Sequence, residues 1–397
     1  MSLDATKLES LLQAALAELH PTARVAGALA GLEPLEEVRL VAIGKAAPAM
    51  ARGALMAWSQ SIVETLVVTT DDTNAAGLQV FRAGHPLPDA RSVTAADLCF
   101  GVAARAASLL VLVSGGASAL VCAPAPGVTL KDKRAVTQAL LESGAPIADI
   151  NVVRKHLSRI KGGGLARAAG GVPVYTLAMS DVVKGGLHDV GSGPSVGDPS
   201  TVAQARRVVA RWAPKYADLP FVKTGRTGAN VGGDVVIAPA DLARAMSSRL
   251  RQRDITVRVL RPSDAPLERL AKEYLRAAKT LAPGHALVRV AEPSLTVTGE
   301  GRGGRSTHLA TLVGRQLPSG CIFAAFATDG VDGTSDTAGA VVDDTFVARA
   351  GEDAIVRALA AFDTGPLHLG LGTAVPTEPT GHNLADLHVL VRTHDGT

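Results

Sequence analysis

The feature that most constrains this fold is a regular alternation of short β-branched runs with alanine-rich stretches at helical spacing. The runs predict strands at 38–43, 65–70, 108–114 and 172–180. Helical stretches lie between them, including one that starts after Thr129, a predicted N-cap, and stops at Gly144. Because parallel strands need a long connection, usually a helix, the alternation predicts an α/β protein with mostly parallel strands.

The pattern continues beyond a glycine-rich break at about 219–238. Further strands are expected at 234–238, 255–260, 294–300, 321–327 and 387–393. A chain of 397 residues exceeds one ordinary hydrophobic core. We therefore predict two domains, a parallel-sheet domain at 1–225 and a second α/β domain at 226–397.

Composition narrows the classes of function. Aromatic residues make up 3% of the chain and the net charge is only +3, so stacking on bases and a nucleic-acid role have little support. A small anionic ligand fits the mild basic excess better. Cys99, Cys122 and Cys321 stand far apart in apolar runs, which predicts buried thiols in a reducing compartment.

The first 20 residues carry apolar side chains at helical spacing together with acids, which predicts an amphipathic helix and not a signal peptide. The longest apolar run is interrupted by Gly115 and Gly116 and is not expected to span a bilayer. We expect a cytoplasmic protein without a membrane partner.

Two predicted strands end in loops that suit an anion. The first ends in Gly44-Lys45, and the strand at 108–114 ends in the sequence SGGAS. The hydroxyl and glycine positions of that loop are Ser114, Gly115, Gly116 and Ser118. Open α/β sheets bind ligands beyond the carboxyl ends of their strands, so both loops are expected at one site, although a solvated lysine and a plain tight turn would explain them too.

Other candidate groups are a cationic run and two acidic loops. Arg154 belongs to the run RKHLSRIK, which three glycines follow, and His156 within it is expected to be structural. Asp181 follows the strand at 172–180, and Asp329 opens the loop DGVDGTSD after the strand at 321–327. Asp181 could hold Mg²⁺, accept a proton or simply cap a helix, and the loop of Asp329 is expected to contact a metal or the substrate.

The sequence GEGRGGR at 299–305 leaves two interpretations open. Its glycines match G-x-G-x-x-G, the dinucleotide fingerprint, through Gly299, Gly301 and Gly304, with Gly303 between them. A lone match is weak, however, and Arg305 offers a guanidinium that binds phosphate oxygens in a bidentate fashion. No P-loop sequence occurs in the chain, so a kinase would have to be of another type.

Taken in order, these loops resemble the class II glycerate 2-kinase family, whose C-terminal part is called the MOFRL domain. The resemblance covers nearly the whole chain and rests on IGKAA, AGHPLPD, LVSGGASALV, NVVRKHLSRIKGGGLA, GSGPSVGDPST, TGEGRGGR, FATDGVDGTSDTAGAVVD and PTGHNLADLHV. It implies a Rossmann-like N-terminal domain, a C-terminal MOFRL-type α/β domain and an active site in the cleft between them. The implied reaction is ATP-dependent phosphorylation of glycerate at its 2-hydroxyl, with Mg²⁺.

The resemblance also implies roles for particular residues. Lys45, Arg305 and Asp181 would be catalytic, and Asp181 and Asp329 would contact the metal. The residues that would bind substrate or nucleotide are Gly44, Ser114, Gly115, Gly116, Ser118, Arg154, Gly299, Gly301, Gly303, Gly304 and Asn383. A homodimer is one assembly such a chain could form.

Two loops depart from the family pattern. Lys184-Gly185-Gly186 replaces an acidic sequence, and Ser306-Thr307-His308 replaces Asn-Gln-Glu. His382 and Ala385 are further differences. Two other functions therefore stay open: a hydroxypyruvate reductase that uses NAD(P)H, and a kinase relative that senses a ligand without turnover.

Overall fold

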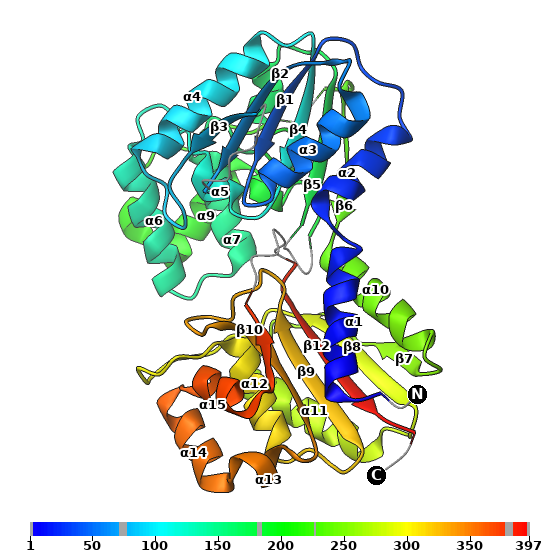
Figure 1. Ribbon diagram of the computed structural model, residues 1–397. Coiled ribbons are helices and arrows are strands. Elements are labelled where there is room, and N and C mark those ends of the chain that lie inside the picture. The colour runs from blue at the N-terminus through cyan, green and yellow to red at the C-terminus, as the bar shows by residue number, and fades with distance from the viewer. Residues whose placement is uncertain (1–2, 71–77, 181–184, 226–227, 378–383, 395–397) are drawn as a thin grey trace. The chain divides into compact units, whose positions relative to one another are not determined.

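The computed structural model describes residues 3–70, 78–180, 185–225, 228–377 and 384–394, which form two compact units (Figure 1). The Rossmann-like unit contains the described residues of Pro21–Asp181 and Gly185–Ile237. The C-terminal unit contains those of Met1–His20 and Ala238–Thr397. None of the helices in the described part of the chain has the length and apolar character that crossing a bilayer requires.

The Rossmann-like unit is built on a parallel sheet. Its strands are β1 (Val38–Ile43), β2 (Ile62–Thr69), β3 (Gln79–Arg82), β4 (Ser108–Val113), β5 (Val174–Met179) and β6 (Val231–Ile237). They run in the order β3-β2-β1-β4-β5-β6, and every adjacent pair is parallel. This order reverses between β1 and β4, which is where open α/β sheets of this type bind ligands.

Helices cover both faces of this sheet. They are α2 (Pro21–Ala30), α3 (Ala47–Trp58), α4 (Ala90–Ala104), α5 (Ala117–Leu120), α6 (Leu130–Glu142), α7 (Ile147–His156), α8 (Gly164–Ala168) and α9 (Val202–Trp212), with short 3₁₀ turns at Val190–Ser192 and Pro214–Tyr216. Figure 1 shows α3 and α4 on opposite faces, so β4 is buried along its whole length. The predicted N-cap is confirmed, because the Thr129 hydroxyl accepts the Asp132 amide at the start of α6.

The C-terminal unit has a mixed sheet. Its strands are β7 (Thr256–Val259), β8 (His285–Ala291), β9 (Cys321–Ala327), β10 (Thr337–Asp343), β11 (Ala374–Pro376) and β12 (Asp386–Arg392), in the order β11-β10-β9-β12-β8-β7. Within this described sheet, β7 and β8 are the one parallel pair. The prediction of mostly parallel strands is thus confirmed for the first sheet and wrong for this one.

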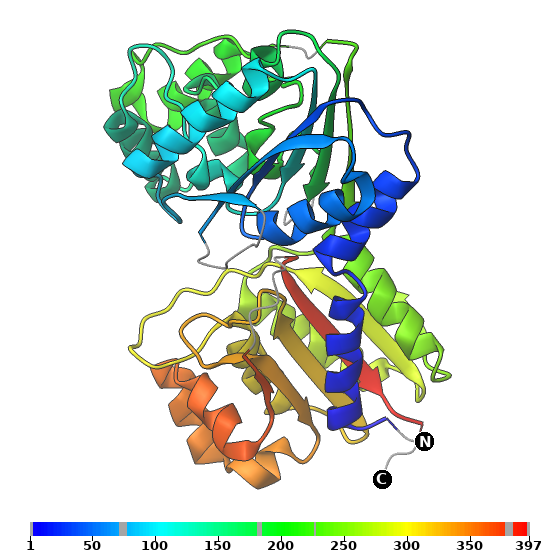
Figure 2. The ribbon, with the colours of Figure 1, turned by 45° about the horizontal axis from the view of Figure 1, so that its top comes forward.

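Helices also cover both faces of the second sheet. They are α1 (Ala5–Ala17), α10 (Pro239–Arg251), α11 (Leu267–Thr280), α12 (Arg305–Gly314), α13 (Phe346–Ala350), α14 (Glu352–Ala361) and α15 (Thr364–Leu371). Figures 1 and 2 both show α1 lying across one face, where it contacts β9, β10 and α10. Helices α11 and α12 pack on the other face around Phe323 and Leu390.

The compact units divide the chain differently from the predicted boundary at 225. Strand β6 completes the first sheet by pairing with β5, so the division falls after Ile237. The amphipathic helix predicted at the N-terminus is α1, and its buried Leu8, Leu12 and Leu16 pack within the C-terminal unit. The strand predicted at 294–300 is absent, since that segment is mostly exposed and β8 lies just before it.

Candidate active site

The loops after β1 and β4 interlock at the carboxyl edge of the first sheet. The Lys45 amide donates to the Gly115 carbonyl (2.9 Å), and the Ala46 amide donates to the Ser114 hydroxyl (3.1 Å). Gly44 has a φ of 133°, and a Cβ there would lie 2.1 Å from the Ser114 hydroxyl oxygen. The expectation that these two motifs meet is confirmed, and glycine is required at 44 for them to do so.

The Lys45 side chain lies along the second of these loops. A Cβ added at Gly116 would lie 3.4 Å from Lys45 Cγ and 3.2 Å from the ring of His85. Burial lowers the pKa of His85, and the charge of Lys45 lowers it further, so this imidazole is held neutral. Among the described residues, the ammonium of Lys45 has no hydrogen-bond or ion-pair partner, which leaves its charge available to a ligand.

Ser118 gathers two cations one turn further on. Its hydroxyl oxygen accepts from Arg154 Nη2 and from Lys161 Nζ, at 2.6 Å each, and lies 3.1 Å from the Ser192 hydroxyl. Lys161 also donates to the carbonyls of Ser118 and Gly191. The sequence analysis assigned Ser118 and Arg154 to the same ligand site, and the structure shows these two side chains in contact.

The triple-glycine loop holds the other side of this cluster. The amides of Gly162 and Gly163 donate to the carbonyls of Ser192 and Gly193, so the loop packs on the GSGP sequence. His156 is structural as expected, because its two ring nitrogens contact the Val222 carbonyl and the Ser200 hydroxyl. The amides of Gly162 and Gly163 thus serve to join two loops of the protein by backbone hydrogen bonds.

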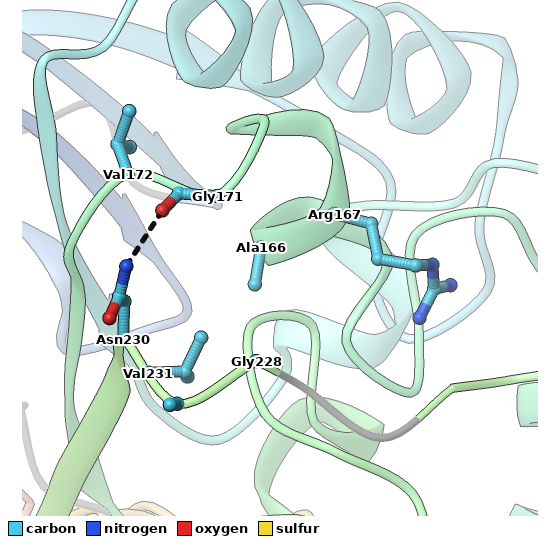
Figure 3. A pocket seen from close by; sticks show the side chains of 8 residues that line it. Ala166, Arg167, Gly171, Val172, Gly228, Asn230 and Val231 are labelled. Carbon is cyan, nitrogen blue, oxygen red and sulfur yellow. Dashed lines mark hydrogen bonds between the residues drawn. The ribbon is translucent and has the colours of Figure 1, made fainter.

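A pocket of about 420 Å³ lies at the other end of the same sheet (Figure 3). Residues at the amino ends of β5 and β6 line it, and Asn230 donates to the Gly171 carbonyl across it (3.0 Å). Arg167 is the charged residue of its lining, and it donates to the Gly162 carbonyl (2.8 Å). Because parallel sheets bind ligands at the carboxyl ends of strands, we do not assign the active site to this pocket.

In the C-terminal unit, the start of α12 is already occupied by a carboxylate. Asp332 accepts the amides of Ser306 (2.9 Å) and Thr307 (2.8 Å) and the Thr307 hydroxyl (2.8 Å). Burial raises the pKa of Asp332, and these hydrogen bonds oppose that rise. A side chain of the protein therefore fills the place where a bound phosphate would sit in a phosphate-binding helix.

The glycines of the GEGRGGR loop are explained by packing. A Cβ at Gly299 or Gly301 would lie 2.5 Å from the Ala361 carbonyl oxygen, and one at Gly304 would lie 2.3 Å from an Asp332 oxygen. Gly303 similarly lies against Thr364. The dinucleotide interpretation also lacks its context, because this loop does not belong to the parallel sheet, whose first strand ends in Gly44-Lys45.

Arg305 points towards a buried acid that the sequence analysis missed. Its Nη2 lies 3.2 Å from Asp386 Oδ1, while its Nη1 is 3.7 Å from Glu292 and its side chain stays 36% exposed. Burial raises the pKa of Asp386 to about 8, and the charge of Arg305 opposes this rise. The guanidinium is thus oriented by Asp386 and remains accessible.

The remaining predicted acids do not form one cluster. Asp336 pairs with Arg302 on the surface, and the Asp329 carboxylate accepts the Val331 amide (3.2 Å) in its own turn. Among the described residues, no three His, Cys, Asp or Glu side chains are arranged to hold a metal ion. Mg²⁺ itself needs only one or two protein carboxylates, because it completes its shell with water and phosphate.

Some predicted positions lie outside the described residues, namely Asp181, Lys184, His382 and Asn383.

His308, one of the departures from the family pattern, is buried and stacks on Phe362, with ring centroids 5.1 Å apart. Burial lowers the pKa of His308, and its Nδ1 has no partner among the described residues.

Two basic residues near Arg154 were not predicted as site residues, Lys133 and Lys161. Lys133 is 6% exposed and Lys161 is 2% exposed. A signal existed for Lys133, since it precedes the buried Val136 and Leu140 by three and seven residues and so shares the apolar face of α6.

Comparison with known proteins identifies the families and relatives that this chain resembles. Residues 7–220 match the family described as a domain of unknown function, DUF4147, and residues 285–386 match the MOFRL family. A protein of Agrobacterium vitis, provisionally named hydroxypyruvate reductase, is 35% identical and covers 97% of this chain and 93% of its own. Glycerate 2-kinase from Pyrococcus horikoshii is 30% identical over 90% of this chain and 88% of its own.

The whole fold also has a solved counterpart. The crystal structure of glycerate kinase from Thermotoga maritima matches with a TM-score of 0.89 and 28% identity, covering 98% of this chain and 99% of that one. The family matches span both units, and the structural match extends over almost every residue. This chain therefore belongs to the class II glycerate 2-kinase family, with a DUF4147 part followed by a MOFRL part.

Proposed function

We propose that this protein is an ATP-dependent kinase that phosphorylates glycerate, or a closely related hydroxy acid, at the 2-hydroxyl. The products would be 2-phosphoglycerate and ADP. The observation that carries this proposal is the ammonium of Lys45, which has no partner among the described residues and lies at the switch point of the parallel sheet. Membership in a family with several glycerate kinases supports the same reaction.

Phosphoryl transfer depends on positioning and on neutralising charge more than on a protein nucleophile. We assign Lys45 and Arg305 to the oxygens of the transferred group, and Asp386 holds Arg305 for that task. Asp181 would accept the hydroxyl proton, and Asp181 and Asp329 would hold Mg²⁺, which neutralises phosphate charge when bound. Ser114, Gly115, Gly116, Ser118, Arg154 and Asn383 would line the substrate and nucleotide sites.

The glycines of the GEGRGGR loop take a different role in this proposal. Since Gly299, Gly301, Gly303 and Gly304 are needed for close packing, they shape the loop that presents Arg305. We further propose that the protein acts in the cytoplasm, a reducing compartment that suits its three buried free cysteines.

The test measures ADP release with glycerate and ATP, beside NADH oxidation with hydroxypyruvate. We expect Mg²⁺-dependent ADP release. Lys45→Ala and Arg305→Ala should each lower turnover at least ~100-fold, as when one donor to a transition-state charge is removed. The matched control is Arg302→Ala, an exposed arginine of the same loop that pairs with Asp336 and should keep near-normal turnover.

Either of two results would contradict the proposed kinase function. Substrate-dependent NADH oxidation without ADP release would favour the reductase suggested by the name of the Agrobacterium relative. A rise in melting temperature with glycerate or ATP, without turnover under any divalent metal, would favour a ligand sensor.

A further inference from the structure

Three basic side chains converge inside the Rossmann-like unit. They come from α6 (Lys133), from α7 (Arg154) and from the segment that follows α7 (Lys161). Lys133 and Lys161 are almost completely buried. Arg154 and Lys161 both reach the Ser118 hydroxyl, which lies three residues beyond Gly115, whose carbonyl accepts the Lys45 amide.

No carboxylate pairs with these three cations among the described residues, and the acidic side chain whose charge acts on all three is the thiol of Cys122. Lys161 and Arg154 donate to hydroxyl, carbonyl and amide oxygens, and Lys133 Nζ is buried with no hydrogen-bond partner. The neighbouring Lys155 differs, since its ammonium lies 3.3 Å from the buried carboxylate of Asp198. The fold can therefore supply a buried carboxylate here, yet it leaves these three cations with no carboxylate partner among the described residues.

Such an arrangement is costly in the free protein. A buried charge without a partner loses its hydration and gains nothing in return. Burial and the nearby Arg154 lower the pKa of Lys133 to about 8, and burial together with Arg154 and Lys133 lowers that of Lys161 well below its usual range. A bound anion would remove this repulsion and supply the missing acceptors.

We propose that Lys133, Arg154 and Lys161, with Ser118, form a subsite for an oxyanion of a substrate. The group is a carboxylate of the hydroxy acid or a phosphate of the nucleotide, since both present planar or tetrahedral oxygens to converging cations. This inference rests on the proposed kinase function for the identity of the ligand. It adds Lys133 and Lys161 to the residues proposed to bind substrate. It also explains why these two lysines are buried although their burial does not stabilise the free protein.

The test uses Lys133→Met, which keeps the length of the side chain and removes its charge. The matched control is Lys131→Met, an exposed lysine two residues earlier in the same helix. Without ligand, Lys133→Met should melt at a higher temperature than the wild type, because it removes a buried charge that has no partner. Lys131→Met should melt close to the wild type.

Ligands then identify the source of the oxyanion. The melting temperature of each variant is measured with D-glycerate, with ADP and with inorganic phosphate added separately. Lys133→Met should lose at least about 10-fold in affinity for one of the two substrates and keep the other, as expected for a lost charge-assisted hydrogen bond. Loss of glycerate binding assigns the subsite to the carboxylate, and loss of ADP binding assigns it to phosphate.

A second variant, Arg154→Met, should weaken the same substrate as Lys133→Met. The inference is overturned if Lys133→Met lowers the melting temperature of the free protein, or if it binds all three ligands like the wild type. These outcomes are separate from those for the reaction. An active wild type with an unaffected Lys133→Met variant rejects the subsite alone, and an inactive wild type whose phosphate binding needs Lys133 rejects the kinase alone.

Discussion

Replacing Asp332 with alanine tests whether a carboxylate of the protein, and not a ligand, holds the start of α12. Asp332 is 2% exposed and accepts two amides and one hydroxyl from the first turn of that helix. Hydrogen bonds to a charged group contribute about 1.5–3 kcal/mol each, and the helix dipole adds up to about 1 kcal/mol. Burying the carboxylate offsets part of this sum, as the raised pKa of Asp332 indicates.

We therefore expect Asp332→Ala to lower the free energy of unfolding by about 3–5 kcal/mol, the usual cost of breaking a buried charged network. For a unit of this size the melting temperature should fall by at least roughly 6 °C. The assay is calorimetric and circular-dichroism melting of the full chain, with Asp336→Ala as the control. Asp336 forms an exposed ion pair with Arg302, whose loss should cost about 1 kcal/mol or less. Equal melting temperatures for the two variants would refute the capping role of Asp332.

Two further predictions concern charge and packing. Because the pKa of Asp386 is about 8 in the folded protein and near 4 when unfolded, the folded state binds more protons between these values, and the free energy of unfolding should fall as the pH rises from about 4 to about 8. Urea unfolding at pH 5 and pH 8 should show a smaller fall for Asp386→Asn than for the wild type, and equal falls would contradict the assignment. Gly27→Ala in the exposed interior of α2, where a Cβ meets no atom within 4 Å, should raise the free energy of unfolding by about 1 kcal/mol. Gly53→Ala in α3 should instead lower it, because a Cβ there would lie 2.3 Å from the Thr22 carbonyl oxygen; a stabilised Gly53→Ala variant would show that the two helices can separate at no cost.

Much of the first unit could be predicted because its signals are local. Strand β4 is buried throughout and appears as an uninterrupted apolar run, and α6 has a capping hydroxyl at Thr129. The positions of the loops after β1 and β4 followed from the rule that parallel strands end at one edge. In such a unit, sequence order and spatial order are closely linked.

The C-terminal unit was harder to predict because its pairing is non-local. The segment at 294–300 has strand-like composition but forms just one isolated bridge among the described residues, between Ser294 and Pro266, while β10 follows an acidic loop and pairs with β9 and β11. The glycines of the GEGRGGR loop could not distinguish a phosphate-binding loop from a closely packed one. A close approach of backbone to backbone at Gly304 needs the same residue as a close approach to phosphate.

Some residues of the candidate site could be predicted and others could not, because only some of them have a local sequence signal. Lys45 and Ser118 stand close to glycines and Arg154 stands in a run of basic residues, so they attract notice, whereas Asp386 and Lys133 lie in ordinary strand and helix sequence. Their environment appears only when distant elements meet. A charged residue on an apolar helical face is the one sequence signal that would have identified Lys133.

The course of the chain has a consequence for how the protein is made on the ribosome. Helix α1 is synthesised before its partners, because its apolar face packs on α10, β9 and β10, which emerge more than 200 residues later. Meanwhile the continuous segment from Pro21 to Ile237 can complete its own sheet, and Arg24 ties its beginning to the Val236 carbonyl near its end. The apolar face of α1 therefore stays uncovered in the nascent chain until β10 has been made, and a fragment that begins at residue 226 or 238 would lack the helix that covers one face of its sheet.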